Sequence, residues 1–576
     1  MATKSISMTA TRWRLSLLGF LLSAVLVAII WRLVDLSIVK PEFYQYYSDK
    51  RWQPSRVVSA ERGVITDRNG QPLAISTPVL TVGMYPSILN RHPEKWHELA
   101  QLLNLDYKKM ASKIKSRSNK SATFVYLKRR IPPQQAAKIM ALEIPGVDLE
   151  SGYKRYYPAG EVATHVLGYT NVDDKGQEGV ELAFDSHLTS IPGRRNVMLG
   201  VKQKVVRELA WHEGKQHKPG GDVELSIDMR LQSIAHYELK KAVTKYRARS
   251  GSLVLLDTTT NEILAMVNQP AANPNDRSHM DFGAFRNRAM TDLIEPGSTI
   301  KPFSVAAALE SGQFDGKSVF NVSPGRIRVD GKLILDAANY GTLDLAGVIK
   351  KSSNVGITQI ALALPETGIR DYLSRMGMGS DTGSGFPGER IGVLPNYQSW
   401  QPVQRATLAY GYGLSVTAVQ LAQAYSIFAS GGVKKPVSIL KLARPPEGEQ
   451  VMKPAVARQV ISMMESVTHR GGTGTRAKVP GYRVAGKTGT AHKVGRNGYE
   501  DSHYIAVFAG LAPVTNPKLV AVVVINDPST EQYHGGQVAA PVFSKVMAAA
   551  LRLKSIAPDQ SVIPDLSSGA WVAGRQ

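Results

Sequence analysis

An uninterrupted apolar segment near the amino terminus limits the folds open to this chain more than any other feature. From Leu15 to Trp31 it carries no charged residue, and it continues to Val34 if the Arg32 side chain extends to the membrane surface. At about 1.5 Å per residue, a helix of about 20 residues spans roughly 30 Å, the thickness of a bilayer core. We therefore expect a transmembrane signal anchor over residues 15–35, rather than a buried core helix or a cleaved signal peptide, whose apolar core is usually shorter.

The residues before this segment indicate its orientation. Lys4, Arg12 and Arg14 are basic and no acidic residue accompanies them. Positively charged flanks favour the cytoplasmic side of a membrane, so residues 1–14 are predicted to be a cytoplasmic tail. No second segment of comparable length and hydropathy follows in the sequence. We expect a single-pass anchor that carries a large extracytoplasmic body.

The overall charge is strongly basic. The chain has 70 Lys and Arg against 47 Asp and Glu, a formal net charge of +23. Residues 113–130 hold several basic residues and no acidic one: Lys113, Lys115, Arg117, Lys120, Lys128, Arg129 and Arg130. In a cytosolic protein such a cluster suggests binding to nucleic acid. The predicted topology places this segment outside the cytoplasm, which argues against that partner. We expect no nucleic-acid partner and interpret the cluster as a solvated face, with attraction to an anionic envelope polymer or partner as the alternative.

Residues 41–220 are predicted to form an irregular α+β module. The stretch Arg62–Gly70 predicts a short strand closed by an Asn-Gly turn, and hence a hairpin. Trp96–Leu103 carries apolar residues at helical spacing. Pro219-Gly220-Gly221 marks the carboxyl-terminal boundary of the module.

Residues 221–558 alternate apolar strands with Ala- and Leu-rich helical segments, which predicts one large α/β or α+β domain. The predicted strands are 223–227, 252–256, 263–267, 504–511 and 519–525, and the predicted helices are 230–246, 298–310, 403–430, 456–467 and 541–553. Residues 559–576 are polar and are expected to form a flexible tail.

Several well-known signatures can be set aside. Gly481–Thr488 matches the phosphate-loop pattern, but the residues after it predict a strand and a hairpin, whereas that loop needs a helix at its lysine. The chain contains neither G-x-S-x-G nor H-E-x-x-H, and His212 and His217 are spaced wrongly for zinc on a helix. It has no cysteine, which excludes disulfides, thiol nucleophiles and cysteine-ligated metals. We expect no metal site.

The segment Ser298-Thr299-Ile300-Lys301 is the strongest candidate for catalysis. It follows Glu295-Pro296-Gly297, a helix-start signal, and residues three apart share a helix face, so the Lys301 amine can stand beside the Ser298 hydroxyl. A serine becomes nucleophilic when a base takes its proton, and a lysine can do so if burial lowers its pKa. The apolar body of the helix fits such burial, and free N–H groups at the helix start can stabilise an oxyanion.

Two later motifs make this assignment specific, because S-x-x-K alone also occurs elsewhere in the chain. Ser352-Ser353-Asn354 offers a hydroxyl and an amide for proton relay and for holding a substrate amide. Lys487-Thr488-Gly489, the only K-T-G in the chain, offers with Thr490 a charge and hydrogen bonds for a carboxylate, while Gly489 permits a substrate backbone to pair closely. The predicted catalytic residues are Ser298, Lys301, Ser352, Asn354 and Lys487, and the predicted substrate-binding residues are Thr488, Gly489 and Thr490.

This ordered triple motif resembles that of penicillin-binding proteins and class A β-lactamases. Further stretches resemble motifs of the division-specific class B penicillin-binding proteins. In the non-catalytic part they are Arg62-Gly63 with Asp67-Arg68-Asn69-Gly70, Arg155-x-Tyr157-Pro158 and Gly176-x-x-Gly179-x-Glu181, and in the catalytic part they are 286–302, 406–414 and 535–543. The resemblance extends from the anchor to about residue 558.

The resemblance implies a multi-domain α+β protein. A non-catalytic pedestal of the dimerisation type would fill 41–220, and a serine penicillin-recognising transpeptidase domain, with a central antiparallel sheet flanked by helices, would fill 221–558. It implies a D,D-transpeptidase that crosslinks peptidoglycan at the division septum. Ser298 would attack the penultimate D-Ala carbonyl of a stem peptide, with Lys301 as base and the N–H groups of Ser298 and Thr490 as oxyanion hole. A diaminopimelate amine would then attack the acyl-enzyme, and β-lactams would acylate the same serine.

The same resemblance implies a location and partners. The protein would be single-pass in the inner membrane, with a periplasmic catalytic body enriched at the septum. Its partners would be peptidoglycan stem peptides, β-lactam antibiotics, membrane lipid, the septal glycosyltransferase FtsW and the divisome proteins FtsQ, FtsL, FtsB and FtsN. Family members use neither a metal nor an organic cofactor.

Three alternative functions share some of these features. A serine β-lactamase shares the motifs but needs a deacylating base, and no Glu-x-x-Leu-Asn element follows the second motif. A D,D-carboxypeptidase would transfer the acyl group to water, which the active-site residues alone do not exclude. A non-enzymatic penicillin-binding sensor or scaffold fits poorly with intact motifs and with the lack of a signalling domain in the sequence.

Overall fold

The computed structural model describes residues 8–39, 55–118, 124–199, 205–211, 216–276, 281–495 and 498–560. The chain divides into two compact units. The first comprises Met1–Glu61, Thr77–Lys154 and Ser190–Pro219, and the second comprises Arg62–Ser76, Arg155–Thr189 and Gly220–Gln576. Two segments of the sequence-predicted pedestal, Arg62–Ser76 and Arg155–Thr189, therefore pack with the catalytic part.

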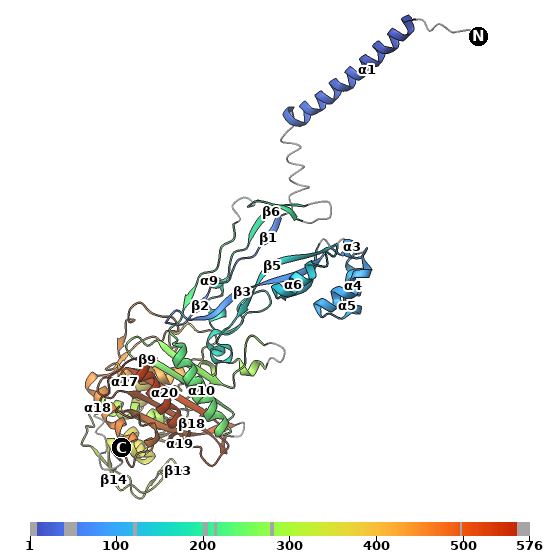
Figure 1. Cartoon of the computed structure of the whole chain (residues 1–576). Coiled ribbons are helices and arrows are strands. Elements are labelled where there is room, and N and C mark those ends of the chain that lie inside the picture. The colour runs from blue at the N-terminus through green and yellow to red at the C-terminus, as the bar shows by residue number, and fades with distance from the viewer. Residues whose placement is uncertain are drawn as a thin grey trace, which may run out of the picture. The chain divides into compact units, whose positions relative to one another are not determined.

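The first helix, α1 (Met8–Val34), contains all but the last residue of the predicted membrane span 15–35 (Figure 1). Residues Arg12–Val34 are long and apolar enough to cross a membrane, and none of that span is buried. Its large apolar side chains face outward, as with Phe20 and Trp31, which are 71% and 69% exposed. Exposing so many apolar side chains to water is unfavourable, so this helix surface suits the hydrocarbon interior of a membrane. The first seven residues of the predicted cytoplasmic tail lie outside the described residues.

The remainder of the first unit is a small mixed α/β body. Its elements are β1 (Ser55–Val58), α3 (Pro86–Leu89), α4 (Trp96–Leu103), α5 (Tyr107–Ser118), β4 (Val125–Ile131), α6 (Pro133–Met140), β6 (Gly193–Leu199) and β7 (Val205–Trp211), with parts of β3 (Pro72–Met84) and β5 (Val147–Tyr156). Strands β1, β6 and β7 form an antiparallel sheet in that order. Helix α4 buries Trp96, Leu99 and Leu103 on one face, as the helical spacing predicted.

The basic cluster of residues 113–130 belongs to this unit, and part of it has a structural use. Lys113 donates to the backbone carbonyl of Tyr126 at 2.7 Å, and the partly buried Lys128 donates to that of Leu103. The first bond joins α5 to β4, and the second joins β4 to the end of α4. Lys120 of this cluster lies outside the described residues.

The second unit holds most of the regular structure. Its helices are α7 (Thr164–Leu167), α8 (Gly179–Ala183), α9 (Asp185–Leu188), α10 (Met229–Lys245), α11 (Arg288–Thr291), α12 (Lys301–Ser311), α13 (Leu345–Lys351), α14 (Asn354–Ala363), α15 (Gly368–Arg375), α16 (Pro402–Ala409), α17 (Ala418–Ala429), α18 (Pro454–Glu465), α19 (Gly535–Val538) and α20 (Ala540–Leu553). Its strands are β2 (Ile65–Thr66), β8 (Val223–Glu224), β9 (Ser250–Asp257), β10 (Ile263–Gln269), β11 (Val319–Asn321), β12 (Arg326–Val329), β13 (Lys332–Leu335), β14 (Thr342–Asp344), β15 (Val433–Lys434), β16 (Glu449–Gln450), β17 (Ala485–Gly495), β18 (Gly498–Ala512) and β19 (Leu519–Asn526).

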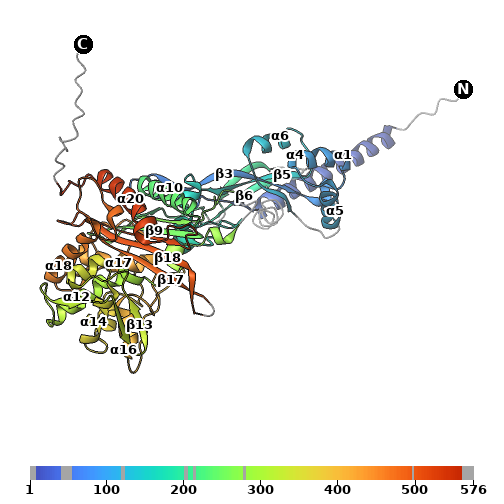
Figure 2. The same ribbon diagram turned by 90° about the horizontal axis from the view of Figure 1, so that it is seen from below.

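A five-stranded antiparallel sheet, in the order β10-β9-β19-β18-β17, forms the centre of this unit. Side chains alternate between its faces: Val520, Val522 and Val524 of β19 enter one hydrophobic core, whereas Ala521 and Val523 enter the other. Helices α10 and α20 cover one face, and α12, α14 and α17 lie on the opposite side (Figure 2). The predicted central antiparallel sheet flanked by helices is confirmed.

Two predicted helical segments differ from the structure in an informative way. The segment 403–430 forms two helices, α16 and α17, because Gly411 and Gly413 between them have positive φ angles of +89° and +78°. Residues 298–310 begin as the 3₁₀ turn η5 (Gly297–Ile300), and the α-helix starts only at Lys301. Both irregular segments lie at the candidate site described below. The predicted strand 223–227 is also shorter, ending at Glu224.

Motif residues from the predicted pedestal form a buried ion network within the second unit. Arg62 Nε donates to Glu181 Oε2 at 2.7 Å, and Arg155 Nε donates to Oε1 of the same carboxylate at 2.6 Å. The three side chains are at most 3% exposed. Buried charges are tolerated only when paired in this way, so the network joins these two segments to each other within the second unit. The predicted hairpin forms beside it, where β2 pairs with the start of β3.

Candidate active site

Ser298 lies in the turn η5, immediately before helix α12, and is half-buried. The turn is held by Gly411, whose carbonyl accepts the N–H of Gly297 at 3.0 Å. A Cβ at Gly411 would lie only 2.0 Å from the Gly297 carbonyl oxygen. Gly411 is therefore needed both for its positive φ and for this close approach.

Two lysines from different motifs meet at Ser352. Lys301 Nζ donates to the backbone carbonyl of Ser352 at 2.6 Å and to Asn354 Oδ1 at 2.7 Å, and it lies 3.3 Å from Ser352 Oγ. Lys487 Nζ lies 2.9 Å from the same hydroxyl. The structure thus brings together Lys301, Ser352, Asn354 and Lys487, as the motif order predicted. Among the described residues, the side-chain hydrogen bonds of Lys301 go to Ser352 and Asn354, none to Ser298.

Burial changes the acid–base properties of both lysines, whose side chains are fully buried. The pKa of Lys301 lies well below its ordinary value, because burial and the positive charge of Lys487 both disfavour the ammonium form. Burial likewise lowers the pKa of Lys487 to about 7. A neutral amine is therefore accessible near neutral pH, which is what a general base requires.

The loop between α13 and α14 presents Ser352 and Asn354. Ser352 ends α13 in the left-handed conformation, with φ of +59°, and Asn354 is the first residue of α14. Asp336, just after β13, accepts hydrogen bonds from Ser353 Oγ at 2.6 Å and from the backbone N–H groups of Asn354 and Val355. Asp336 therefore fixes the start of α14, and Ser353 is used for this capping rather than for the site.

The third motif lies on β17, at the edge of the central sheet. Thr488 Oγ1 is 2.7 Å from Thr473 Oγ1, and Thr490 Oγ1 accepts the N–H of Gly535 at 3.1 Å. An edge strand leaves one row of backbone groups without a strand partner, which an extended peptide can use. The segment Gly481–Thr488 is not a phosphate loop, because Lys487 lies in strand β17 and not at the start of a helix.

Glycine at position 489 is required by packing between the first and third motifs. A Cβ there would lie 2.8 Å from the Pro296 carbonyl oxygen and 3.0 Å from Thr299 Cγ2. A Cβ added to Gly297 would in turn lie 3.5 Å from that of Ala491. The turn that carries Ser298 therefore rests directly on residues 489–491 of β17.

Three residues of this arrangement escaped the sequence analysis. Asp336 and Thr473 belong to no recognisable motif, and Gly411 lies within a stretch noted only for its resemblance. Within the described ranges, the structure contains no group of three or more His, Asp or Glu residues arranged to hold a metal ion.

The sequence was compared with known families and proteins. Residues 251–548 match the family model for the penicillin-binding protein transpeptidase domain, and residues 57–225 match that for the penicillin-binding protein dimerisation domain. The peptidoglycan D,D-transpeptidase FtsI of Escherichia coli K12 is 41% identical over 573 residues, which cover 98% of this chain and 96% of that protein. The probable peptidoglycan D,D-transpeptidase PbpC of Pseudomonas aeruginosa is 40% identical over 550 residues, covering 96% of both.

A solved structure supports the same relationship. The transpeptidase domain of Burkholderia pseudomallei penicillin-binding protein 3 superposes with a TM-score of 0.54 at 40% identity, covering 58% of this chain and 98% of that one. The fold, the three motifs and these matches define a penicillin-binding protein with a transpeptidase domain. Within that class, the chain belongs to the FtsI family of class B penicillin-binding proteins.

Proposed function

We propose that the protein is a serine-type D,D-transpeptidase that crosslinks peptidoglycan stem peptides through an acyl-enzyme on Ser298. The observation that carries this proposal is the network in which two fully buried lysines, Lys301 and Lys487, share the Ser352 hydroxyl. A lysine kept neutral by burial has few structural uses, whereas a serine hydrolase or transferase without histidine needs one. The serine-bearing turn lies beside this network at an open sheet edge.

The geometry suggests how the first half-reaction proceeds. The Ser298 hydroxyl gives its proton to neutral Lys301 as its Oγ bonds to the penultimate D-Ala carbonyl carbon. The N–H groups of Ser298 and Thr490 hold the oxygen that becomes negative, and Asn354 holds a substrate amide. The proton then passes through Lys301, Ser352 and Lys487 to the nitrogen of the terminal D-Ala, which leaves as the carbon–nitrogen bond breaks.

The second half-reaction transfers the acyl group to another stem peptide. Its side-chain amine attacks the ester carbonyl, Ser298 Oγ leaves and recovers a proton, and a crosslink results. Thr488 and Thr490, on the edge strand with Gly489, bind the terminal carboxylate of the first peptide. β-Lactams mimic that terminus, so they acylate the same serine and block the site.

The location and partners follow from the anchor and the family. Helix α1 anchors the protein in the inner membrane, with its amino terminus in the cytoplasm and its catalytic body in the periplasm. The protein acts at the division septum with the glycosyltransferase FtsW and the divisome proteins FtsQ, FtsL, FtsB and FtsN. Midcell enrichment of a fluorescent fusion supports the septal role, whereas uniform sidewall labelling contradicts it.

Product analysis separates transpeptidation from the carboxypeptidase alternative. The full chain in detergent is incubated with nascent peptidoglycan made by a glycosyltransferase partner, and the digested products are separated by mass. Crosslinked dimers are expected with the unmodified protein and none with Ser298→Ala. Tetrapeptides without dimers would indicate a D,D-carboxypeptidase, and absence of both products would indicate a non-enzymatic sensor or scaffold.

A further inference from the structure

Helix α5 of the first unit presents a strongly charged surface that the proposed function does not explain (Figure 1). The helix carries five basic residues and no acidic one, and all five side chains are exposed. We call them the basic face, and they are Lys108, Lys109, Lys113, Lys115 and Arg117. The hydrogen bond from Lys113 to the Tyr126 carbonyl joins α5 to β4, but a carbonyl does not neutralise the charge of the amine.

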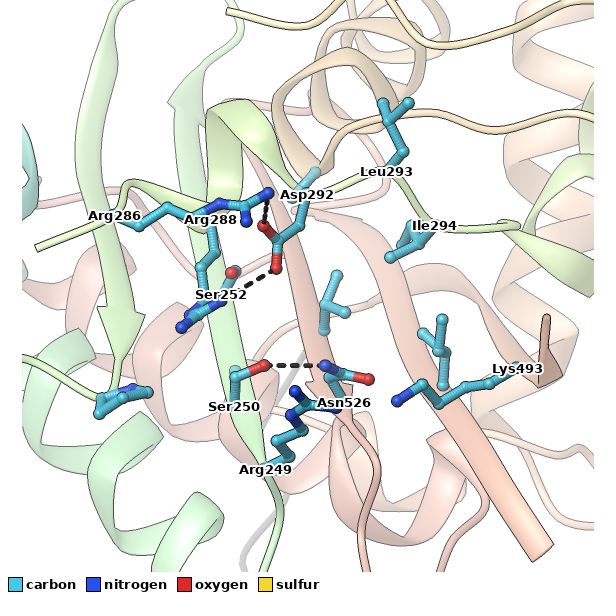
Figure 3. Close-up of a pocket in the computed structure, with 15 residues that line it drawn as sticks. Arg249, Ser250, Ser252, Arg286, Arg288, Asp292, Leu293, Ile294, Lys493 and Asn526 are labelled. Atoms are coloured by element: carbon cyan, nitrogen blue, oxygen red, sulfur yellow. Dashed lines mark hydrogen bonds and ion pairs between the residues drawn. The ribbon is translucent and has the colours of Figure 1, made fainter. Parts of the chain in front are cut away.

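The charges of the basic face are not balanced by carboxylates. In the part of the chain that the structure describes, none of the five side chains forms an ion pair. Asp106, directly before the helix, accepts the backbone N–H of Lys109 at 2.8 Å. Basic side chains of the second unit behave differently: Figure 3 shows a cavity in which Arg286 and Arg288 both contact Asp292, at 2.7 and 3.3 Å. The basic face therefore keeps an excess of positive charge at its surface.

The spacing of these charges is unfavourable for the helix itself. Lys109, Lys113 and Arg117 follow one another four residues apart, a spacing at which like charges repel. Lys108 and Lys109 also lie in the first turn, where the partial positive charge of a helix amino terminus disfavours cations. Local conflicts of this kind are expected at functional sites. An anionic partner on the basic face would relieve both.

The opposite side of α5 belongs to the core of the first unit. Met110 and Ile114 are buried there, together with Leu103 of α4. The apolar residues of the helix are thus already used in packing, and they are not available for insertion into a bilayer or into an apolar groove. A partner of the basic face must therefore be held at the surface by charge, as a peripheral contact.

A membrane is within reach of this unit. The unit that contains α5 also contains α1, the helix that is long and apolar enough to span a bilayer. Residues 40–54, between the anchor segment and β1, can extend over at most about 50 Å. A tethered surface meets its target at a high effective concentration, so weak contacts suffice. Anionic phospholipid headgroups supply the negative charge that clustered Lys and Arg residues attract.

We propose that the basic face of α5 docks on the anionic phospholipid headgroups of the membrane in which α1 is anchored. The lysine and arginine side chains contact headgroup phosphates, while Met110 and Ile114 stay in the protein core. The contact gives the first unit a second attachment to the membrane besides α1. This inference goes beyond the proposed function and does not depend on the chemistry at Ser298.

Energy transfer between α5 and the lipid surface tests this proposal. Because the chain has no cysteine, Ser112→Cys creates a single site for a neutral donor fluorophore. Ser112 is exposed and lies three residues from both Lys109 and Lys115, on the same side of the helix. The labelled full-length protein is reconstituted into vesicles of phosphatidylcholine, with or without about 30% phosphatidylglycerol. Both vesicle types carry an acceptor dye on a small fraction of their headgroups.

We expect energy transfer to be at least about twofold larger in the phosphatidylglycerol vesicles at low salt. About 1 M NaCl should reduce it to the level in phosphatidylcholine, because the Debye length falls to about 3 Å. Lys109→Gln with Lys115→Gln should remove at least about half of the difference between the vesicles. The matched control, Arg326→Gln with Arg458→Gln, removes two exposed charges from the second unit and should leave the difference intact.

Three results would overturn the proposal. The first is equal transfer in the two vesicle types, and the second is a difference that survives either high salt or the double lysine variant. The third is equal transfer combined with slower rotation of the fluorophore when soluble polyglutamate is added, which would assign the basic face to an acidic polypeptide. Thermal midpoints confirm that the variants are folded, and penicillin labelling of Ser298 reports separately on the proposed function.

Discussion

The side-chain nitrogen of Lys487 lies 2.9 Å from the hydroxyl oxygen of Ser352, a residue 135 positions earlier in the chain. That hydroxyl also faces Lys301 Nζ at 3.3 Å. One serine thus connects the lysines of the first and third motifs, and a proton can pass between them without entering water.

Replacing Lys301 with methionine keeps the volume of the side chain but removes the base. We expect the second-order rate constant for acylation by a fluorescent penicillin to fall by about 10²- to 10⁴-fold. In the unmodified protein the rate should decrease as pH is lowered, because the ammonium form of Lys301 cannot accept the serine proton. Stopped-flow acylation between pH 5 and 8 measures both effects. A Lys301→Met variant with the original rate would exclude this residue as the base.

Lys487 should make stability depend on pH. Its pKa is lowered by burial to about 7 in the folded protein, whereas an unfolded lysine titrates near 10.4. Between these values the unfolded chain binds more protons, so the Lys487 contribution to the free energy of unfolding rises with pH, by up to about 1.4 kcal/mol per unit. Below about pH 7 both states are protonated, and the full cost of burying the charge applies.

The Lys487→Met variant lacks the Lys487 contribution to this pH dependence and serves as the reference for the unmodified protein. Thermal midpoints of the two proteins are compared from pH 7 to 9. We expect the unmodified protein to gain stability relative to the variant as pH increases. Parallel curves across this range would show that Lys487 keeps an ordinary pKa.

Asp336 should act on catalysis by positioning the second motif. Asp336→Asn weakens the acceptor for Ser353 Oγ and the N–H groups at the start of α14, so we expect a loss of about 1–2 kcal/mol in stability and roughly tenfold slower acylation. Asp344→Asn is the matched control, because Asp344 caps α13 through the N–H of Gly347 at 2.7 Å. It should lose similar stability yet acylate normally. Equal acylation rates in the two variants would refute the positioning role.

The turn that carries Ser298 should tolerate no side chain at position 411. Gly411→Ala places a Cβ 2.0 Å from the Gly297 carbonyl, so the turn must move and acylation should fall at least tenfold. Gly413→Ala also imposes strain at a positive φ, of about 1 kcal/mol, but its Cβ meets nothing within 4 Å. Both thermal midpoints should decrease, while only the first variant loses acylation. Loss of acylation in both would point to a general effect of strain.

Much of the second unit follows from local patterns. The continuous apolar run from Leu519 to Ile525 predicts a buried strand, and the order of the three motifs predicts that Lys301, Ser352, Asn354 and Lys487 meet. The strand is readable because the spacing of residues along a strand fixes which side chains share a face, whereas the meeting of the three motifs is what their resemblance to a known ordered signature implies.

Contacts between distant segments could not be read in this way. Asp336 caps α14 from the end of a separate hairpin, and Arg62 meets Arg155 through the carboxylate of Glu181. The close approach that excludes a side chain at position 411 involves the carbonyl of Gly297, which lies more than a hundred residues earlier. A pairing that only the folded chain brings together leaves no periodic signal in the sequence.

Covalent labelling of Ser298 is the most direct test of the central claim. The full-length protein is incubated with benzylpenicillin, digested, and analysed by mass spectrometry. The account predicts one added penicilloyl group, on the peptide that contains Ser298, and no adduct in the Ser298→Ala variant. An adduct on a different residue, or equal labelling of the variant, would contradict the assignment of Ser298 as the nucleophile.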